Sequence, residues 1–394
     1  MTTRNTAGAY GSHRVDAALF LCLFAAQAGA IVLSPVLAGV ARDFDVPTAL
    51  AGQLRTIAGL AATGSALASH RFGARAGLGR QLLAGSILLA VGSLASAAAP
   101  DIELLAAAQV PVGAAIGILT TAGTLAAAEW VPPERRPATL SRTLVGQPAA
   151  WIVGMPLLGA AGAQSWRYAW LVFPLAAALL AAAAVVGHSS APPARSEPAP
   201  MRATLAAPGL GRWLTAEILV NTAWAGTLVY SGALFVESYG ASTDLTGVVL
   251  AFGACAYVSG NLALRRRVGC EPRQLLVGLS VVLAVATAAF GALRPSLPVS
   301  GALFAAAAFA AGGRTLLSSA FGLAAPPQFR PGAMAMRAAS MQLGYFTGSL
   351  TAGAALAWGG YTALGATSCA LFLSAALVLR RPPAHGAAAR PVSA

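Results

Sequence analysis

Residues 132–137 read PPERRP and residues 326–331 read PPQFRP, so two hexamers that share the pattern PPxxRP begin 194 residues apart. In both copies, an Arg and a Gln five residues apart follow the hexamer, and two Gly five residues apart come next. The matched positions are Arg142, Gln147, Gly154 and Gly159 in the first copy and Arg337, Gln342, Gly348 and Gly353 in the second. This order predicts that a duplicated unit fills the chain, and chance similarity among Ala, Pro and Gly residues is the alternative.

The composition is that of a protein whose surface faces lipid rather than water. Apolar residues make up 57% of the chain and charged residues only 9%, whereas ordinary globular proteins carry roughly 25% charged residues. A chain with so few charges cannot cover its surface with polar groups, and a bilayer is the solvent that suits it. The net charge of +13 comes from Arg residues spread between apolar runs, which argues against a nucleic-acid-binding face.

Apolar runs recur along the whole chain, each about as long as the roughly 20 residues that a helix needs to cross a bilayer. Runs this long and uniform predict helices, because only helices and closed barrels can span lipid. The first run is too long for a signal-peptide core, so we expect it to be retained. The twelve predicted spans are 16–40, 48–69, 80–99, 102–128, 139–163, 166–187, 212–236, 243–264, 273–293, 297–323, 333–357 and 360–379.

The Arg residues in the loops and near the ends of the spans predict the orientation, because Arg and Lys are enriched on the cytoplasmic side. With the N-terminus in the cytoplasm, the inner segments hold 20 Arg and the outer loops hold only Arg42, Arg167 and Arg294. We therefore expect a multi-pass protein of the cell inner (plasma) membrane with both termini in the cytoplasm.

One connection, at residues 188–211, is rich in Pro, Ser and Ala and predicts a cytoplasmic linker. It separates the sixth predicted span from the seventh. The expected units are therefore an N-terminal six-helix bundle at 1–187 and a C-terminal six-helix bundle with a short cytoplasmic tail at 212–394.

Four stretches of the chain carry a family resemblance. They are SPVLAGVARDFDVPTALAG (34–52), WVPPERRPATLSRTLVG (130–146), GMPLLG (154–159) and SWRYAW (165–170). Together they resemble the major facilitator superfamily, and GMPLLG is similar to the Gly-Pro-Gly signature on helix 5 of its twelve-helix drug:proton antiporter (exporter) branch. The chain departs from the family in ALASHRFGARAGLGR (66–80) and GNLALRRRVG (260–269), which lack the usual acidic residue, and at Gln109, where exporters often carry Arg.

The resemblance implies an all-α integral membrane protein with twelve transmembrane helices in two pseudo-symmetric six-helix bundles. It implies a secondary transporter that exports a small amphipathic organic compound, such as a drug or natural product, by proton antiport and alternating access. A sugar or metabolite exporter, or an uncoupled facilitator, is the alternative that the missing family charges favour. A membrane sensor that has lost transport is a further alternative.

No enzymatic chemistry, cofactor, metal or nucleic-acid partner is expected. The four Cys form no CxxC pair, and the four His fall in polar stretches rather than at membrane depth. No GxxxxGK[ST] sequence occurs, and the chain has no Lys to complete one, so we expect no ATP hydrolysis. The expected partners are a small-molecule substrate, a proton and the lipid bilayer, around a monomer.

Ionisable side chains inside the predicted spans are the proton-coupling candidates, because such groups are costly in lipid. They are Glu217, Arg314 and Arg55. At 1.5 Å per residue, Glu217 and Arg314 lie about 8 Å and about 13 Å from the same membrane boundary, so our hypothesis is an ion pair in the central cavity. Snorkelling of Glu217 is the alternative. Arg55 is expected either to contact Asp43 or Asp45 or to snorkel outward.

Polar and aromatic residues on the cavity-lining helices that the resemblance implies are candidates for substrate contact, with interhelical packing as the alternative. Asn221 and Trp224 follow Glu217 at i+4 and i+7 and so share its helix face. The substrate-cavity candidates are Gln27, Ser34, Gln109, Asn221, Trp224 and Ser318.

The fifth predicted span carries glycines that let backbones approach and a proline that bends the helix, which suits a rocking interface between the halves. Ordinary small-residue packing is the alternative. Three Arg of the expected cytoplasmic loops join this set, because those loops correspond to the family's gating contacts. The conformational-switch candidates are Gly146, Gly154, Pro156, Gly159, Arg71, Arg136 and Arg330.

Overall fold

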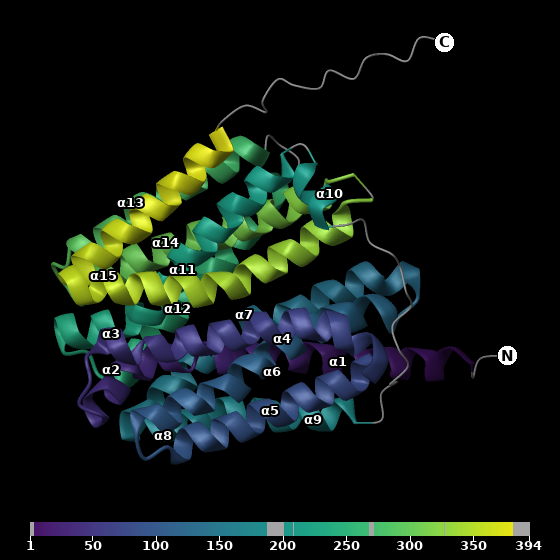
Figure 1. The fold of residues 1–394 in the computed structure, drawn as a ribbon, viewed down its shortest axis with the longest axis horizontal. Coiled ribbons are helices and arrows are strands. Elements are labelled where there is room, and N and C mark those ends of the chain that lie inside the picture. The colour runs from purple at the N-terminus through teal and green to yellow at the C-terminus, as the bar shows by residue number, and fades with distance from the viewer. Residues whose placement is uncertain (1–3, 187–200, 208, 268–271, 327, 381–394) are drawn as a thin grey trace, which may run out of the picture.

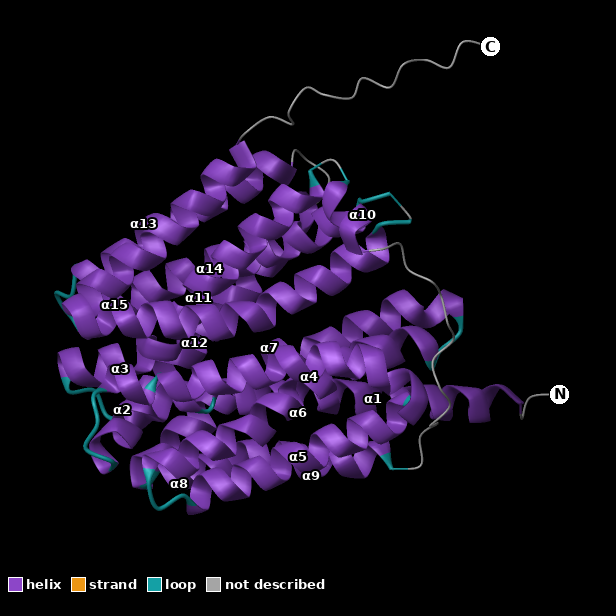
Figure 2. Cartoon of the chain, in the orientation of Figure 1, coloured by secondary structure: helices purple, strands orange, loops and turns teal. Residues whose placement is uncertain are grey.

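A computed structural model describes residues 4–186, 201–207, 209–267, 272–326 and 328–380, and the regular structure in these ranges is helical throughout (Figure 2). A helix satisfies its backbone hydrogen bonds internally, which is what an apolar run in lipid requires. The expected all-α membrane fold is therefore confirmed.

The helices fall into two groups, which we call the first bundle and the second bundle (Figure 1). The first bundle contains α1 (Arg4–Ile31), α2 (Leu33–Asp43), α3 (Thr48–Ala51), α4 (Gln53–Ala76), α5 (Leu78–Ala98), α6 (Ile102–Glu129), η1 (Pro133–Arg135), α7 (Arg136–Gln164), α8 (Trp166–Trp170), η2 (Leu171–Leu175) and α9 (Ala176–Val185). The second bundle contains α10 (Met201–Ala206), α11 (Leu210–Tyr239), α12 (Thr243–Leu264), η3 (Arg265–Arg267), α13 (Pro272–Ala292), α14 (Leu297–Leu323) and α15 (Arg330–Arg380). The predicted division at residues 188–211 stays a prediction, because residues 187–200 and 208 lie outside the described residues.

Ten segments of the described chain are long and apolar enough to cross a membrane. One of them, Gly332–Arg380, holds two of the twelve predicted spans, and the helix is broken between them at Gly359 and Gly360. Gly360 has a φ of 64°, in the left-handed region that favours glycine. The predicted span at 48–69 corresponds to α3 and α4, which are not among the ten, because polar side chains such as Arg55 interrupt the apolar run.

The two bundles repeat the same close helix contacts. In the first bundle, Gly113 of α6 faces the carbonyl group of Ala58 in α4. In the second bundle, Gly312 of α14 faces the carbonyl group of Tyr257 in α12, with both partners 199 residues further along the chain. Missing side chains at such positions let helix backbones touch, as is common in membrane bundles. The matched contacts support the duplication that the two hexamers predict.

The bundles meet at one end of the molecule, which we call the closed end and which carries α2, α3 and α8 (Figure 1). There, Gly232 of α11 packs against the backbone of Ser34 in α2, and Gly159 of α7 packs against Gly247 of α12. Gln53 donates a hydrogen bond to the Tyr230 hydroxyl group across the same boundary, at 3.3 Å. Toward the opposite end, which carries α10 and the start of α1, the two bundles diverge in Figure 1.

Candidate functional site

A central cavity of about 900 Å³, part of it open to solvent, lies between the two bundles. The first bundle contributes Gln27, Gln147, Pro148 and Trp151, none of them charged. Every charged residue that lines the cavity among the described residues comes from the second bundle, so the two walls differ in chemistry.

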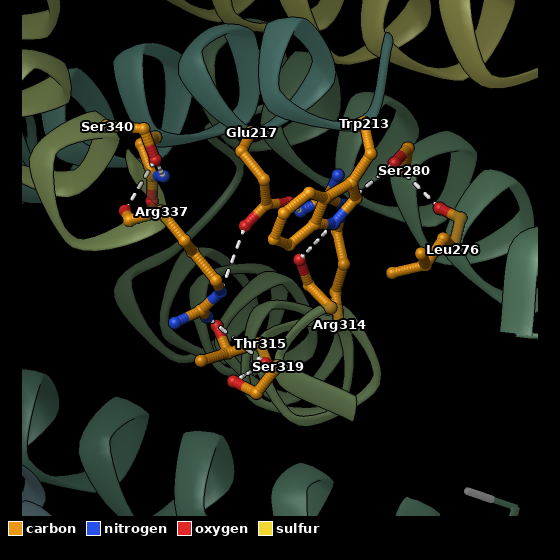
Figure 3. Close-up of polar contacts among 11 residues, drawn as sticks. Trp213, Glu217, Leu276, Ser280, Arg314, Thr315, Ser319, Arg337 and Ser340 are labelled. Carbon is orange, nitrogen blue, oxygen red and sulfur yellow. Dashed lines mark hydrogen bonds and ion pairs between the residues drawn. The ribbon is translucent and has the colours of Figure 1, made fainter. Parts of the chain in front are cut away.

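The charged wall is built around Glu217 of α11, which lies between two guanidinium groups (Figure 3). Arg314 Nη1 donates to Glu217 Oε1 at 2.6 Å, and Arg314 Nε donates to Ser280 Oγ at 3.0 Å. Glu217 and Arg314 are each only 2% exposed, so Glu217 does not snorkel to the boundary. The pair has the geometry that the sequence hypothesis described, and its role in proton coupling stays a prediction.

Arg337 is the second guanidinium on Glu217, and sequence reasoning missed it as a site residue. Its Nε lies 3.4 Å from Glu217 Oε2, and its Nη2 donates to the Thr315 carbonyl group at 3.2 Å. The α15 helix begins at Arg330, so Arg337 lies two turns inside a helix, within the span predicted at 333–357.

The repeat contained the signal for Arg337. Its first-copy match, Arg142, forms an ion pair with Asp16 of α1, and Arg135 lies 3.9 Å from the same carboxylate group. Helices α1 and α11 therefore each present a buried acid to the matched Arg, Asp16 to Arg142 and Glu217 to Arg337.

Aromatic and amide side chains form part of the remaining cavity wall. Trp224 stacks on Phe304 with ring centroids 6.2 Å apart, and Asn221 Nδ2 donates to Ser340 Oγ at 3.1 Å. Gln27, Asn221 and Trp224 line the cavity as the sequence predicted, and Trp151 and Tyr345 add aromatic surface that it did not identify.

Three predicted cavity residues lie elsewhere, so their assignment to the cavity wall is corrected. Gln109 is 1% exposed and donates to Ser96 Oγ at 3.2 Å, between α6 and α5. Ser34 lies at the closed end against Gly232. Ser318 is fully buried behind the ion pair, where it accepts a hydrogen bond from Trp213 Nε1 at 2.9 Å.

Arg55 contradicts both sequence expectations. It is 2% exposed, so it does not snorkel, and Asp43 instead accepts hydrogen bonds from Trp166 and Arg167. The Arg55 guanidinium group lies over the Tyr345 ring, 4.4 Å from its centroid, which is a cation–π contact between the bundles. Its Nε and Nη2 atoms are buried without hydrogen-bond partners.

We predict that Arg55→Met stabilises the protein in the conformation described. Burying a donor without a partner costs about 1–3 kcal/mol, and methionine fills the space without that cost. Thermal unfolding in detergent should therefore shift to higher temperature for Arg55→Met and stay unchanged for Arg42→Met, an exposed position. A lower unfolding temperature for Arg55→Met would show that the cation–π contact outweighs desolvation.

The predicted switch residues separate into two groups. A side chain at Gly146 would meet the Phe20 backbone, and a side chain at Gly154 would meet the Phe173 ring. Both contacts lie within the first bundle, so the expected role of these two glycines at the interface between the bundles is corrected to packing within one bundle. Gly159 lies at the contact between the bundles, against Gly247.

The remaining switch candidates are Pro156 and three Arg. Pro156 lies inside α7, which continues to Gln164. Arg136 is exposed at the start of α7. The side chains of Arg71 and Arg330 lie outside the described residues, so their switch role stays a prediction.

No group of three or more His, Cys, Asp or Glu side chains that could hold a metal ion occurs in the described part of the chain. The chemistry that the site offers is that of one carboxylate, two guanidiniums, amide groups and aromatic rings.

Comparisons with known proteins place this geometry in context. A family model for the Major Facilitator Superfamily matches residues 19–313. The galactose-proton symporter of Escherichia coli strain K12 is 30% identical over 132 residues, covering 31% of this chain and 28% of the symporter. A chloramphenicol efflux pump of Mycobacterium tuberculosis is 31% identical over 149 residues, covering 38% of this chain and 36% of the pump. The chain thus spans only about a third of the length of the curated relatives it matches.

Solved structures share the fold at low sequence identity. A D-xylose-proton symporter superposes with a TM-score of 0.75 and 16% identity, covering 94% of this chain and 97% of that one. A bacterial homologue of the human lysosomal transporter Spinster superposes with a TM-score of 0.71 and 13% identity, covering 93% and 94% of the two chains.

Proposed function

This chain belongs to the Major Facilitator Superfamily, and we propose that it exports a small amphipathic organic compound through the central cavity by alternating access. The single observation that carries the proposal is the cavity between two duplicated bundles, lined by aromatic rings and by a buried ion pair. In secondary transporters of this kind, substrate sites lie near the midplane between the repeats.

We propose that the conformation described faces the cytoplasm. The Arg bias of the loops favours cytoplasmic termini, which makes the closed end the outer end. The contacts of Gly232 and Gly159 then close the outer side, and the divergence of the bundles lies on the inner side. Export begins when cargo enters from the cytoplasm and ends when the closed end opens.

Glu217 is the proposed coupling residue. It is the acidic side chain that lines the cavity in the described chain, and it can hold either a proton or its Arg partners. In proton antiport, cargo that hydrogen-bonds to Glu217 displaces the proton, which leaves on the side where the cargo binds. The Gly-Pro-Gly pattern at 154–159 and the chloramphenicol efflux relative support the export direction.

A second candidate is proton-linked transport of a sugar or other metabolite. The galactose-proton symporter matches this chain about as well as the efflux pump does. The amide groups of Gln27, Gln147 and Asn221 offer the hydrogen bonds that a polyhydroxylated cargo needs.

The proposed setting is a multi-pass monomer in the inner membrane, working with a proton and without cofactor. Ten apolar segments support the membrane setting, and the Arg bias supports the orientation. Uncharged lining residues such as Trp151 and Trp224 suit cargo that is largely apolar.

Growth of an efflux-deficient bacterial host on a panel of antibiotics, with and without the gene, tests the export proposal. We expect a higher inhibitory concentration for at least one amphipathic compound, and pH-gradient-driven movement of that compound into inverted vesicles. Vesicle uptake of galactose and xylose tests the second candidate in parallel. Protection against no compound, together with no pH-driven flux of any compound tested, would contradict both.

A further inference from the structure

The central cavity holds more positive than negative charge. The charged residues that line it in the described chain are two guanidiniums, Arg314 and Arg337, and one carboxylate, Glu217. All three are largely removed from water, with side-chain exposures of 3% for Arg314, 3% for Glu217 and 11% for Arg337. An unpaired charge buried in this way is expensive, and one carboxylate cannot neutralise two cations.

The hydrogen bonding of the two guanidiniums is also incomplete. Arg314 uses Nη1 for Glu217 and Nε for Ser280, and its Nη2 atom is buried without a partner. Arg337 uses Nη2 for the Thr315 carbonyl group, while its Nε makes an ion pair but no hydrogen bond with Glu217. The site therefore has both an excess positive charge and unused donors on the two groups that carry it.

From this imbalance we propose that the cavity binds an anionic group, a carboxylate or sulfonate on an aromatic or aliphatic body, between Arg314 and Arg337. Guanidinium donors form short, strong hydrogen bonds to carboxylate-like oxygens. Trp224 and Tyr345 border the same space and offer apolar surface to the body of the cargo. The inference rests on the proposed function only in taking this cavity as the transport site.

The anion and Glu217 compete for the same two guanidiniums. An anion that takes them leaves Glu217 without its partners, which favours a proton on its carboxylate group. With Glu217 neutral and the anion bound, the cavity carries the same net charge as when it is empty and Glu217 is ionised. Anionic cargo is therefore expected to move together with a proton, in the direction of the second candidate rather than of export, whereas cargo that binds Glu217 itself moves against one.

Two probes of the same shape test the site by isothermal titration calorimetry on the purified chain. 2-Naphthoate carries the negative charge, and 2-naphthamide is its neutral counterpart. We expect 2-naphthoate to bind at least about tenfold more tightly than 2-naphthamide. Arg337→Gln should abolish this preference, while Arg142→Gln, which removes the matched Arg of the first bundle, should leave it unchanged. Equal or undetectable binding of the two probes by the unaltered protein overturns the proposal.

A gain of affinity provides a readout that misfolding cannot imitate. Glu217→Gln frees both guanidiniums from their carboxylate, so we expect it to bind 2-naphthoate more tightly and 2-naphthamide as before. Weaker binding of 2-naphthoate by a folded Glu217→Gln variant would overturn the site. Protection of cells against neutral compounds, without any preference for anions, would overturn the anion site and leave the export proposal standing. Binding that prefers the anionic probe, without transport, would support the anion site and overturn the export proposal.

Discussion

Glu217→Gln is expected to abolish transport driven by a pH gradient while leaving exchange of cargo between two sides at equal pH. Glutamine keeps the shape of the side chain and one acceptor oxygen but cannot carry a proton between the two sides. Ionisable residues buried in transporters commonly serve as such relays. We expect gradient-driven flux in vesicles to fall at least about tenfold, to the level of vesicles without the protein.

Asp16→Asn is the matched control for Glu217→Gln. Asp16 of α1 is also a buried acid and pairs with the matched Arg142, but it does not line the cavity. We expect this variant to keep its response to the pH gradient. Removing one partner of a buried pair costs about 3–5 kcal/mol, so folding of both variants must be checked by size-exclusion and thermal unfolding. Unchanged proton coupling in a folded Glu217→Gln variant would remove the proposed role.

The sequence was sufficient for the helices and for the pairing of Glu217 with Arg314. Apolar runs of membrane length can form little else in lipid, and a rise of 1.5 Å per residue places two side chains at a depth without any knowledge of packing. The duplication was visible because both copies keep the same residues in the same order.

The rotation of each helix about its axis could not be predicted from the sequence. In a uniformly apolar span, no polar stripe distinguishes the side that faces the cavity from the side that faces a neighbour. Gln109 shows the consequence, because it lies on a helix that was expected to line the cavity and yet turns toward Ser96 of α5. Arg55 was misplaced for a related reason, since its partner Tyr345 lies 290 residues away in the other bundle.

A close contact between the two bundles toward the closed end is the second feature on which transport should depend. Gly59 of α4 lies against the backbone of Phe346 in α15, one turn from Arg55 and next to Tyr345. The contact is between backbones, so neither side can move aside by changing a rotamer. Close approach at Gly59 therefore holds the Arg55 guanidinium group over its ring and joins the two bundles in this conformation.

Gly59→Ala is expected to prevent closure at this end and to reduce transport at least about tenfold, because interiors this tightly packed do not yield to an added methyl group. A Cβ atom at position 59 would lie 2.6 Å from the Phe346 backbone nitrogen and 2.9 Å from its Cα atom. The control is Gly64→Ala in the same helix, where an added Cβ atom meets nothing within 4 Å. Both changes raise helix propensity by the same amount, about 1 kcal/mol, so that effect cancels.

Spin labels on opposite bundles at the closed end would report the change in conformation that Gly59→Ala produces. Leu50 of α3 and Leu245 of α12 are exposed there, at 52% and 42%, and suit labelling after the native Cys are replaced. We expect the distance between the labels to lengthen in Gly59→Ala and to stay unchanged in Gly64→Ala. Alternating access requires the two ends of the molecule to close in turn. A variant in which the bundles stay separated at this end should therefore still bind cargo but not complete the transport cycle. Equal distances and equal transport in the two variants would show that Gly59 does not control closure.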